Sequence, residues 1–405
     1  MMVHTSATRS GRLEGCGGSG SAGPPASPLG EAPAGRFGGA LIRPWAQPVL
    51  LKGEWATALA VFAAIGVLVP LLHVMLPEGA ALRPSTYLVT LVGKILCYAV
   101  VAVALDLIWG FAGVLSLGHG LFFALGGYAW GMYLMRQIGR DGSYQSDLPD
   151  FMVFLDWKAY PWYWAGTDNP LWAGFLVLAV PGLLALVFGW FMFRSRIKGV
   201  YLSIVTQALT YAAMLLFFRN ETGFGGNNGF TDFKRIFGIP ITAPATRAWL
   251  LAASALLLLG AFVLCRWMVR SKFGRVLEAI RDAEPRVMFL GYDPLPYKLT
   301  AWVVSALLCA LAGALYVPQV GIINPSEMST ANSIEIAVWV AVGGRGTLWG
   351  PVIGAFTVNL AKSFFTQTFP MLWLFFLGGL FVLVTLFLPD GIAGLLKRLR
   401  GRGAS

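Results

Sequence analysis

The chain has 405 residues, of which 57% are hydrophobic and only 12% are charged. Soluble domains carry about 25% charged residues, so this composition excludes an ordinary soluble protein. It predicts an all-α, polytopic membrane bundle, because only closed barrels and helices satisfy the backbone within a bilayer. The net charge of +11 could indicate a nucleic-acid-binding protein, but the basic residues stand in short loops beside apolar runs. That distribution is typical of membrane proteins, so we expect lipid rather than nucleic acid around the chain.

The chain begins with a segment that differs from the rest. Residues 1–50 are rich in Gly, Ala, Pro and Ser without hydrophobic periodicity, which predicts a disordered tail. Residues 397–405 form a second, short and basic tail. The membrane domain therefore occupies residues 51–396.

We expect about ten membrane spans, because a helix needs about 20 apolar residues to cross the hydrocarbon core. The eighth apolar run is too short to cross unaided and predicts a broken or re-entrant helix. The expected spans are residues 55–76, 87–109, 117–135, 171–193, 200–218, 248–269, 299–322, 333–342, 351–368 and 371–388.

The orientation follows from the basic residues. Lys and Arg crowd residues 194–198, 266–286 and 397–402, which fall on one side of a ten-span arrangement. Basic loops face the cytoplasm, so both termini are expected there. The segment 137–170, which carries five aspartates, is expected on the opposite side.

The first segment that could carry function is the glycine-rich run at residues 110–128. Glycine costs roughly 1 kcal/mol relative to alanine within a helix, so a cluster of glycines has a structural reason. One interpretation is tight helix packing, with His119 bonded to a backbone carbonyl. The other is a helix break that lines a translocation path, with Ser116, Gly118 and His119 at it.

A second glycine-rich run, residues 221–233, follows directly after an expected span. It lacks the Gly-Lys-Ser/Thr ending of a phosphate-binding loop, and no such motif occurs in the chain. It is either a flexible Asn-Gly turn on the outer side or a part of the path. Asn227 and Asn228 are its candidate path residues.

The loop at residues 270–298 is amphipathic, although it joins two spans. Ser271 is a candidate N-cap, Pro285 should kink or restart the helix, and Gly291 should end it. The helix either lies on lipid headgroups or inserts into a groove of a soluble partner. The residues expected to make that contact are Phe273, Val276, Leu277 and Ile280 as apolar anchors, Arg281 and Glu284 at the rim, and Gly291 at the end.

The third glycine-punctuated segment, residues 333–355, begins with Glu335 on a short apolar helix that ends at Gly343 and Gly344. A carboxylate within a membrane segment costs about 3 kcal/mol, so Glu335 should face protein or water, unless it is hydrated at the interface. Breaks of this kind in both halves of a chain point to a translocation site.

The residue types that carry catalysis are scattered. The histidines and cysteines form no metal-ligand set, disulfide framework or nucleophilic constellation, and no ATP site is present. We therefore expect no enzyme activity, cofactor or metal. Lys94 and Asp106 share one span but lie about 18 Å apart along a helix, too far to pair.

These segments together resemble a known family. Residues 113–128, with Ser116, Gly118 and His119, and residues 343–355 resemble permeases of branched-chain amino-acid and urea importers of the ATP-binding-cassette (ABC) class. Gly274, Arg281, Gly291 and Lys298 stand where such permeases carry their cytoplasmic coupling loop. Residues 223–233 look like the urea branch, and the resemblance covers about residues 88–396.

The resemblance implies a permease subunit that carries urea inward across the bacterial plasma (inner) membrane. It implies four kinds of partner: a second, homologous permease, two ATP-binding subunits, an extracytoplasmic solute-binding protein, and urea as substrate. A branched-chain amino-acid importer is the alternative within the class. A passive urea channel or an ion-coupled carrier is the alternative from another class, and the docking loop argues against both.

Overall fold

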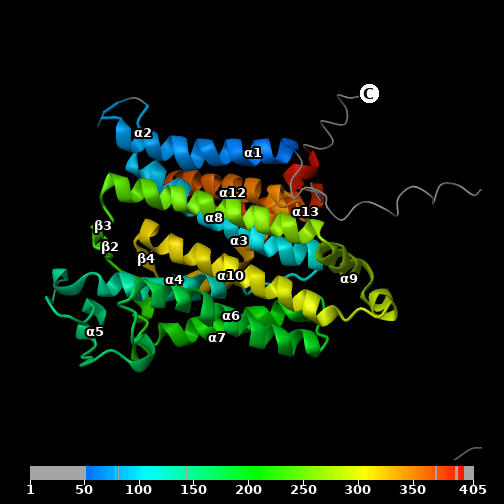
Figure 1. The fold of residues 1–405 in the computed structure, drawn as a ribbon, viewed down its shortest axis with the longest axis horizontal. Coiled ribbons are helices and arrows are strands. Elements are labelled where there is room, and N and C mark those ends of the chain that lie inside the picture. The colour runs from blue at the N-terminus through cyan, green and yellow to red at the C-terminus, as the bar shows by residue number, and fades with distance from the viewer. Residues whose placement is uncertain are drawn as a thin grey trace, which may run out of the picture. The chain divides into compact units, whose positions relative to one another are not determined.

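The computed structural model describes residues 52–77, 79–80, 82–142, 144–369, 372–387 and 391–395. They belong to one compact unit, and the expected tails at residues 1–50 and 397–405 lie outside the described residues. Within the described part the regular elements are helices apart from four two-residue strands (Figure 1). The predicted all-α class is confirmed.

The helices that make up the bundle follow the expected apolar runs. Two π-helical stretches continue these helices: η1 (Ala63–Leu68) joins the first two helices, and η2 (Leu107–Phe111) extends the third. The helices are α1 (Lys52–Phe62), α2 (Val69–Met75), α3 (Thr86–Asp106), α4 (His119–Arg136), α6 (Pro170–Arg194), α7 (Val200–Phe218), α8 (Pro244–Arg270), α10 (Pro294–Val320), α11 (Thr330–Gly343), α12 (Trp349–Thr368) and α13 (Trp373–Phe387).

Helix α9 and several short elements join the helices of the bundle. These are α5 (Asp150–Phe154), α9 (Lys272–Phe289), and the 3-10 turns η3 (Gly139–Asp141), η4 (Trp162–Trp164), η5 (Asn220–Thr222), η6 (Gly226–Asn228) and η7 (Pro325–Met328). Strand β1 (Phe230–Thr231) pairs antiparallel with β4 (Ile322–Ile323), and β2 (Arg235–Ile236) pairs with β3 (Ile239–Pro240).

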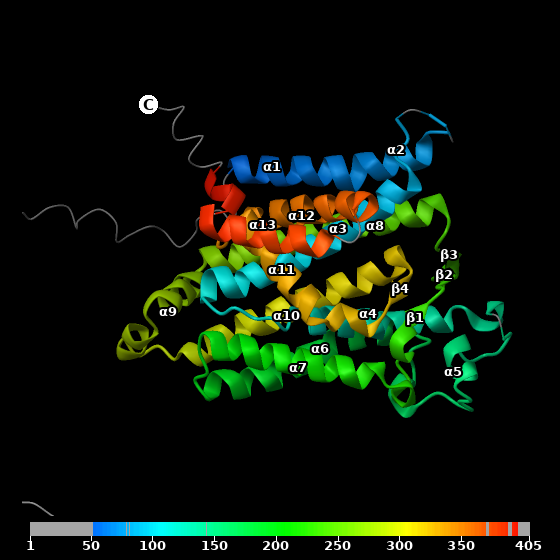
Figure 2. The same ribbon diagram turned by 180° about the vertical axis from the view of Figure 1, so that it is seen from behind.

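Helices α3, α4 and α10 form the centre of the bundle. Helix α10 packs against α4, α6 and α3, and α3 also packs against α8 and α12 (Figures 1 and 2). The most apolar windows of α3 and α10 are each 67% buried, whereas that of α6 is 22% buried. Small residues allow the close approach, because a methyl group on Gly126 or Gly313 would collide with a backbone carbonyl of the facing helix.

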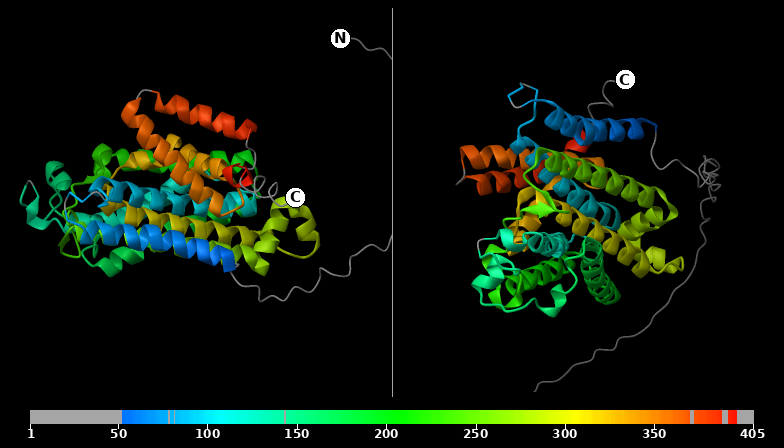
Figure 3. Two further views of the ribbon diagram at one scale, coloured as in Figure 1. Left: turned by 90° about the horizontal axis from the view of Figure 1, so that it is seen from above. Right: turned by 60° about the vertical axis from the view of Figure 1, so that its left-hand side comes forward.

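The connecting elements gather at the two ends of the bundle. Helix α9 projects from one end, and α5 with strands β2 and β3 lies at the other (Figures 1 and 3). The basic residues of 194–198 and 266–286 stand at the α9 end, and the aspartates of 137–170 stand at the α5 end. The assignment of the α9 end to the cytoplasm stays a prediction.

Each expected span coincides with a described helix, but the number of complete crossings stays a prediction. Six of the described helical segments are long and apolar enough to cross a membrane: Ala56–Met75, Thr86–Phe111, Pro170–Arg194, Val200–Phe218, Pro244–Arg270 and Pro294–Val320. Helix α11, with 14 residues, extends about 21 Å and falls short of a hydrocarbon core of about 30 Å. It is a short helix that ends at a glycine break, as its sequence predicts.

Helix α9 has the predicted break and end but not the predicted cap. The backbone leaves the helical region at Ala283, so that Pro285 restarts the helix, and Gly291 ends it with a φ of +86°. The expected cap is wrong. The Ser271 hydroxyl donates back to Met268 O in helix α8 and makes no capping hydrogen bond to α9.

Candidate functional site

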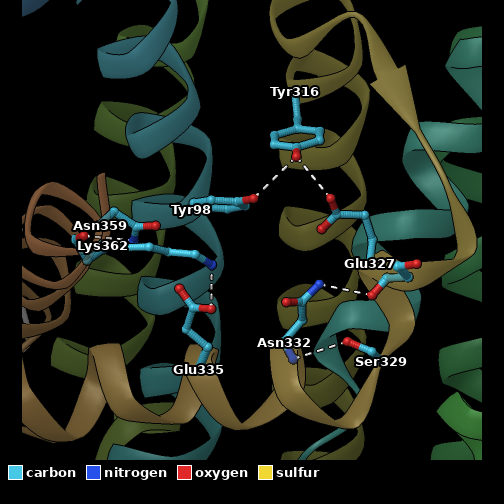
Figure 4. Close-up of polar contacts among 10 residues, drawn as sticks. Tyr98, Tyr316, Glu327, Ser329, Asn332, Glu335, Asn359 and Lys362 are labelled. Atoms are coloured by element: carbon cyan, nitrogen blue, oxygen red, sulfur yellow. Dashed lines mark hydrogen bonds and ion pairs between the residues drawn. The ribbon is translucent and has the colours of Figure 1, made fainter. Parts of the chain in front are cut away.

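A narrow cavity lies within the bundle between α3, α4, α11 and α12. Aromatic rings of Tyr98, Phe123 and Trp339 make its walls, and polar side chains enter it from several elements (Figure 4). Its lining is Tyr98, Val101, Gly120, Phe123, Glu327, Asn332, Glu335, Ile336, Trp339 and Lys362. Tyr98 is the middle residue of the span Thr86–Phe111, so the cavity lies near mid-membrane depth.

Glu335 is the charged group most deeply placed in this cavity. The residue is only 5% exposed, and its Oε2 pairs with Lys362 Nζ at 2.7 Å (Figure 4). Its other carboxylate oxygen, Oε1, has no hydrogen-bond partner in the described structure, and neither has the indole Nε1 of Trp339. Buried polar atoms are nearly always paired in folded proteins, so an unpaired acceptor and an unpaired donor one helical turn apart indicate a ligand position.

A second polar group stands across the cavity. Tyr316 donates its hydroxyl to Glu327 Oε1 at 2.9 Å and accepts a hydrogen bond from the Tyr98 hydroxyl at 3.3 Å (Figure 4). The ammonium of Lys94 lies 5.6 Å from the centre of the Tyr98 ring. The cavity thus presents carboxylates, hydroxyls and amines against aromatic surface.

The glycine-rich loop at residues 221–233 positions one wall of this site. Strand β1, at its end, pairs with β4 immediately before the segment that carries Glu327. Phe224 packs at 3.9 Å from the ring of Phe217, and the Trp164 indole donates to Gly223 O. The loop is therefore packed in place by aromatic residues, although four of its glycines have positive φ.

The cap of α11 supports the opposite wall. Ser329 precedes the helix, and its side chain accepts a hydrogen bond from Asn332 N at 3.3 Å. The Asn332 amide donates to Ser326 O at 2.9 Å (Figure 4). This local ordering orients the first turns of α11, from which Glu335 and Trp339 project.

Of the eight expected path residues, Glu335 alone is part of the described lining of this cavity. Asn227 and Asn228 are exposed in the turn η6 at the α5 end of the bundle. Gly343 and Gly344 lie at the C-terminal end of α11 and do not line the cavity. The glycine segments therefore do not all converge on one place.

Ser116, Gly118 and His119 lie in a closed hydrogen-bonded cluster. The Ser305 hydroxyl donates to Ala104 O, so His119 Nε2 donates to Ser305 at 2.7 Å. His119 Nδ1 lies 3.2 Å from the Ser116 hydroxyl, which also accepts from Gly118 N. His119 thus binds two serine hydroxyls, rather than the backbone carbonyl that the packing interpretation expects.

Several residues that line the cavity or bond to its lining were missed by sequence analysis. Tyr98, Tyr316 and Trp339 look like ordinary aromatic residues of apolar spans. Lys362 and Glu327 carry a usable signal, because charged residues near apolar runs are expensive and face protein or water. Lys362 stands six residues before the end of α12, and its pairing with Glu335 of α11 depends on tertiary structure.

The expected anchors of α9 face the chain itself. Leu277 is fully buried and Ile280 is 2% exposed, because α9 packs against α8 and α10. Phe273 stacks on Tyr297 with ring centres 5.4 Å apart, and Val276 is half-buried. The prediction that this stripe projects toward a partner is wrong for Leu277 and Ile280, since the stripe finds its apolar surface within the same chain.

The two expected rim residues of α9 also make internal contacts. Arg281 donates Nη1 to Gly110 O at 2.6 Å. Glu284 bridges Lys198 at 2.7 Å and Lys298 at 2.9 Å, joining the α6–α7 loop to the start of α10. Burial would raise the pKa of Glu284, but the hydrogen bonds from Lys198 and Lys298 outweigh it and hold the pKa below its usual value.

Comparison with known proteins identifies the family. The family model for "Branched-chain amino acid transport system / permease component" matches residues 87–385. The chain belongs to this permease family. It is the permease subunit of an ABC importer, as the glycine segments predict, and this membership excludes neither urea nor an amino acid as the solute.

The permease is similar to permeases of named importers. It is 28% identical to the high-affinity branched-chain amino acid transport system permease protein LivM of Salmonella typhimurium over 319 residues, covering 73% of this permease and 67% of the relative. It is 26% identical to LivM of Escherichia coli over 320 residues, with the same shares covered.

A third relative has another named solute. The permease is 28% identical to the autoinducer 2 import system permease protein LsrC of Klebsiella pneumoniae over 225 residues, which covers 54% of this permease and 62% of that protein. No solved structure matches the permease. These relatives favour the branched-chain amino-acid alternative over urea, and they leave this permease's own solute open to proposal.

Proposed function

We propose that this permease holds its solute in the cavity at Glu335 and that the solute is urea. The observation that carries the proposal is the unpaired pair Glu335 Oε1 and Trp339 Nε1, one acceptor and one donor on adjacent turns of α11. Urea offers the complementary groups, because its amino groups donate and its carbonyl accepts. Its flat face suits the aromatic walls that Tyr98 and Phe123 provide.

The size and charge of the cavity support a small neutral solute. The cavity is narrow, and its charged lining groups already have partners, since Glu335 pairs with Lys362 and Glu327 accepts from Tyr316. A solute without net or separated charge need not displace that ion pair. The likeness of residues 223–233 to the urea branch points the same way.

A branched-chain amino acid is the second candidate, favoured by the family description and by the names of the LivM relatives. The cavity has carboxylates for an ammonium group and Lys362 for a carboxylate, and Lys94 lies beside its wall residue Tyr98. This solute would have to separate Glu335 from Lys362 and widen the space for its branched side chain.

Partners follow from the same proposal. Phe289 and Leu290, at the end of α9, are 92% and 77% exposed. We assign this apolar tip, rather than the buried stripe, as the contact with an ATP-binding subunit, because large exposed apolar residues on a loop mark protein interfaces. An extracytoplasmic solute-binding protein would meet the α5 end.

The second permease subunit has a candidate surface on α12. Lys362 is 36% exposed, and beside it Ser363 and Gln367 contact the Tyr87 hydroxyl on an exposed face. Polar groups facing lipid are costly, so this face is expected to be covered by protein or to border water. A second, homologous permease on this face would close the cavity.

The experiment compares uptake of radiolabelled urea and radiolabelled leucine by the complete importer in proteoliposomes. Trp339→Phe keeps the ring and removes the donor, so urea uptake should fall about tenfold through a higher KM. Trp302→Phe is the matched control, because its buried Nε1 is also unpaired but does not line the cavity.

Glu335→Gln separates the two solutes. The amide keeps an acceptor for urea but removes the charge that an ammonium group requires, so urea uptake should fall only a few-fold. If the wild type imports leucine and not urea, and Glu335→Gln abolishes that import, the amino-acid candidate replaces urea. If Trp339→Phe and Trp302→Phe behave alike, the cavity is not the solute site.

A further inference from the structure

A buried carboxylate joins the C-terminal end of α3 to the glycine break that follows α11. Asp106 is fully buried and accepts hydrogen bonds from Gly346 N at 2.6 Å and Leu348 N at 3.0 Å. Gly346 and Leu348 both have positive φ, at +75° and +61°. Backbone N–H groups turned inward by such left-handed residues form an anion-binding nest, and Asp106 is its anion.

Helix α9 reaches the same place from the other side. Arg281 Nη1 donates to Gly110 O, and the Arg281 side chain lies so close to Gly113 that a methyl group there would be 2.6 Å from Cγ. A methyl group on Gly110 would collide with the Asp106 carboxylate and lie 2.7 Å from Gly346 N. Gly110 thus lies between Arg281 of α9, which bonds its carbonyl oxygen, and the nest, which leaves no space for a side chain.

The chemistry of this joint suits a contact that is broken and remade. A permanent joint between helices is more stable when it is apolar, because burying a carboxylate is costly even with full hydrogen bonding. Leu348 is held in a conformation that costs about 1–2 kcal/mol for a residue other than glycine. Strain of this kind persists only where the surrounding structure maintains it, and it is released when the contact opens.

The nest follows the C-terminal end of α11, the helix that carries the proposed solute site. Gly344 N donates the last helical hydrogen bond of α11 to Val340 O. The nest begins two residues later, at Gly346. Glu335 and Trp339 lie on that same helix. A displacement of the nest therefore moves the two atoms that the proposed site uses.

We propose that Asp106, Gly110 and Arg281 form a latch that transmits movement of α9 to α11. The latch rests on the proposed docking of an ATP-binding subunit at the tip of α9. Asp106 and Arg281 are positioning residues, because neither contacts the cavity. When the ATP-binding subunit shifts α9, Arg281 pulls the Gly110 carbonyl to which it is hydrogen-bonded. The backbone of the nest around Asp106 then moves, and α11 with the solute site moves with it.

The test measures amide hydrogen exchange of the complete importer without nucleotide and with ATP and vanadate. In the wild type, exchange at Gly346 and Leu348 should differ about fivefold or more between the two states. Arg281→Ala should remove most of that difference while α9 itself still responds. Arg275→Ala, which removes an exposed arginine from the same helix, should keep the difference.

The outcomes separate the latch from the docking proposal. If nucleotide changes exchange in α9 but not at residues 346–348 of the wild type, the latch is wrong and docking stands. If α9 does not respond either, both proposals fall.

Asp106→Asn gives a functional readout, measured as solute imported per ATP hydrolysed, with radiolabelled urea or leucine as the probe that the wild type imports. A latch predicts that ATP hydrolysis continues while this ratio falls about tenfold. If Asp106 has only a structural role, import and ATP hydrolysis should fall together, in proportion to the amount of folded protein. That result would overturn the proposal.

Discussion

The two helix breaks of this permease look alike in sequence but differ in their hydrogen bonding. At the first, residues 113–119, Ser116 and His119 bind one another and Ser305 of α10. On α11, before the second break, Glu335 and Trp339 each keep one buried polar atom without a partner. Glycine content therefore locates the breaks. The polar atoms without partners at the cavity are what set the proposed solute site apart from the paired Ser116 and His119.

The two breaks also differ in what holds their backbone in place. The first is held to α7 from outside, since Leu117 N donates to Thr206 Oγ1 and Ser203 donates to Leu115 O. The second folds around the single carboxylate of Asp106 and uses a strained Leu348 to do so. The first break is a packing device, and we assign the second to movement.

The largest expected difference concerns a single methyl group at each break. Gly343→Ala should lower the free energy of unfolding by about 3 kcal/mol, because the new Cβ would collide with the Gly350 carbonyl, which is backbone and cannot rotate away. Gly118→Ala should cost less than about 1 kcal/mol, since its nearest neighbour is Thr206 Cβ at 3.2 Å.

Thermal unfolding of the two purified variants in detergent checks this contrast. The yield of folded protein extracted from membranes provides a second measure. Equal losses at the two glycines would contradict the inference that Gly343 is closed in by backbone atoms and Gly118 is not.

A smaller effect separates stability from transport. Ser305→Ala leaves the buried His119 Nε2 without its acceptor, which should cost about 1–2 kcal/mol of stability while uptake per folded molecule stays at the wild-type level. Trp339→Phe should do the reverse, with stability preserved and uptake reduced. Thermal unfolding and uptake measured on the same preparations give both values, and a loss of uptake in Ser305→Ala would place the first break on the path.

Much of the fold follows from the sequence. Apolar run length predicts where each long helix lies, and Pro285 and Gly291 predict the kink and the end of α9 because both act through local backbone geometry. The cap at Ser271 was wrong because the competing acceptor, Met268 O, belongs to the preceding helix. The burial of Leu277 and Ile280 could not be predicted, since an amphipathic stripe does not say what covers it.

The candidate site was predictable only in part. Glu335 stands out because a carboxylate in an apolar helix needs a reason. Its partner Lys362 lies 27 residues away, and Tyr98 more than 200, so their meeting depends on how the helices pack. The spacing of Lys94 and Asp106 on one helix predicts that they do not pair. No sequence pattern predicts that Asp106 instead accepts hydrogen bonds from the backbone at residues 346–348.

The most direct test of the central claim compares solute protection at the two breaks. Single cysteines at Asn332 and at Ser116 would be introduced into a transport-competent variant without the four native cysteines, and each would be treated with a small, hydrophilic thiol reagent. We predict that the cysteine at position 332 reacts and that urea slows its reaction, whereas the one at position 116 stays unreactive. Reaction and urea protection at position 116, with none at 332, would contradict the assignment of the cavity at Glu335 as the solute site.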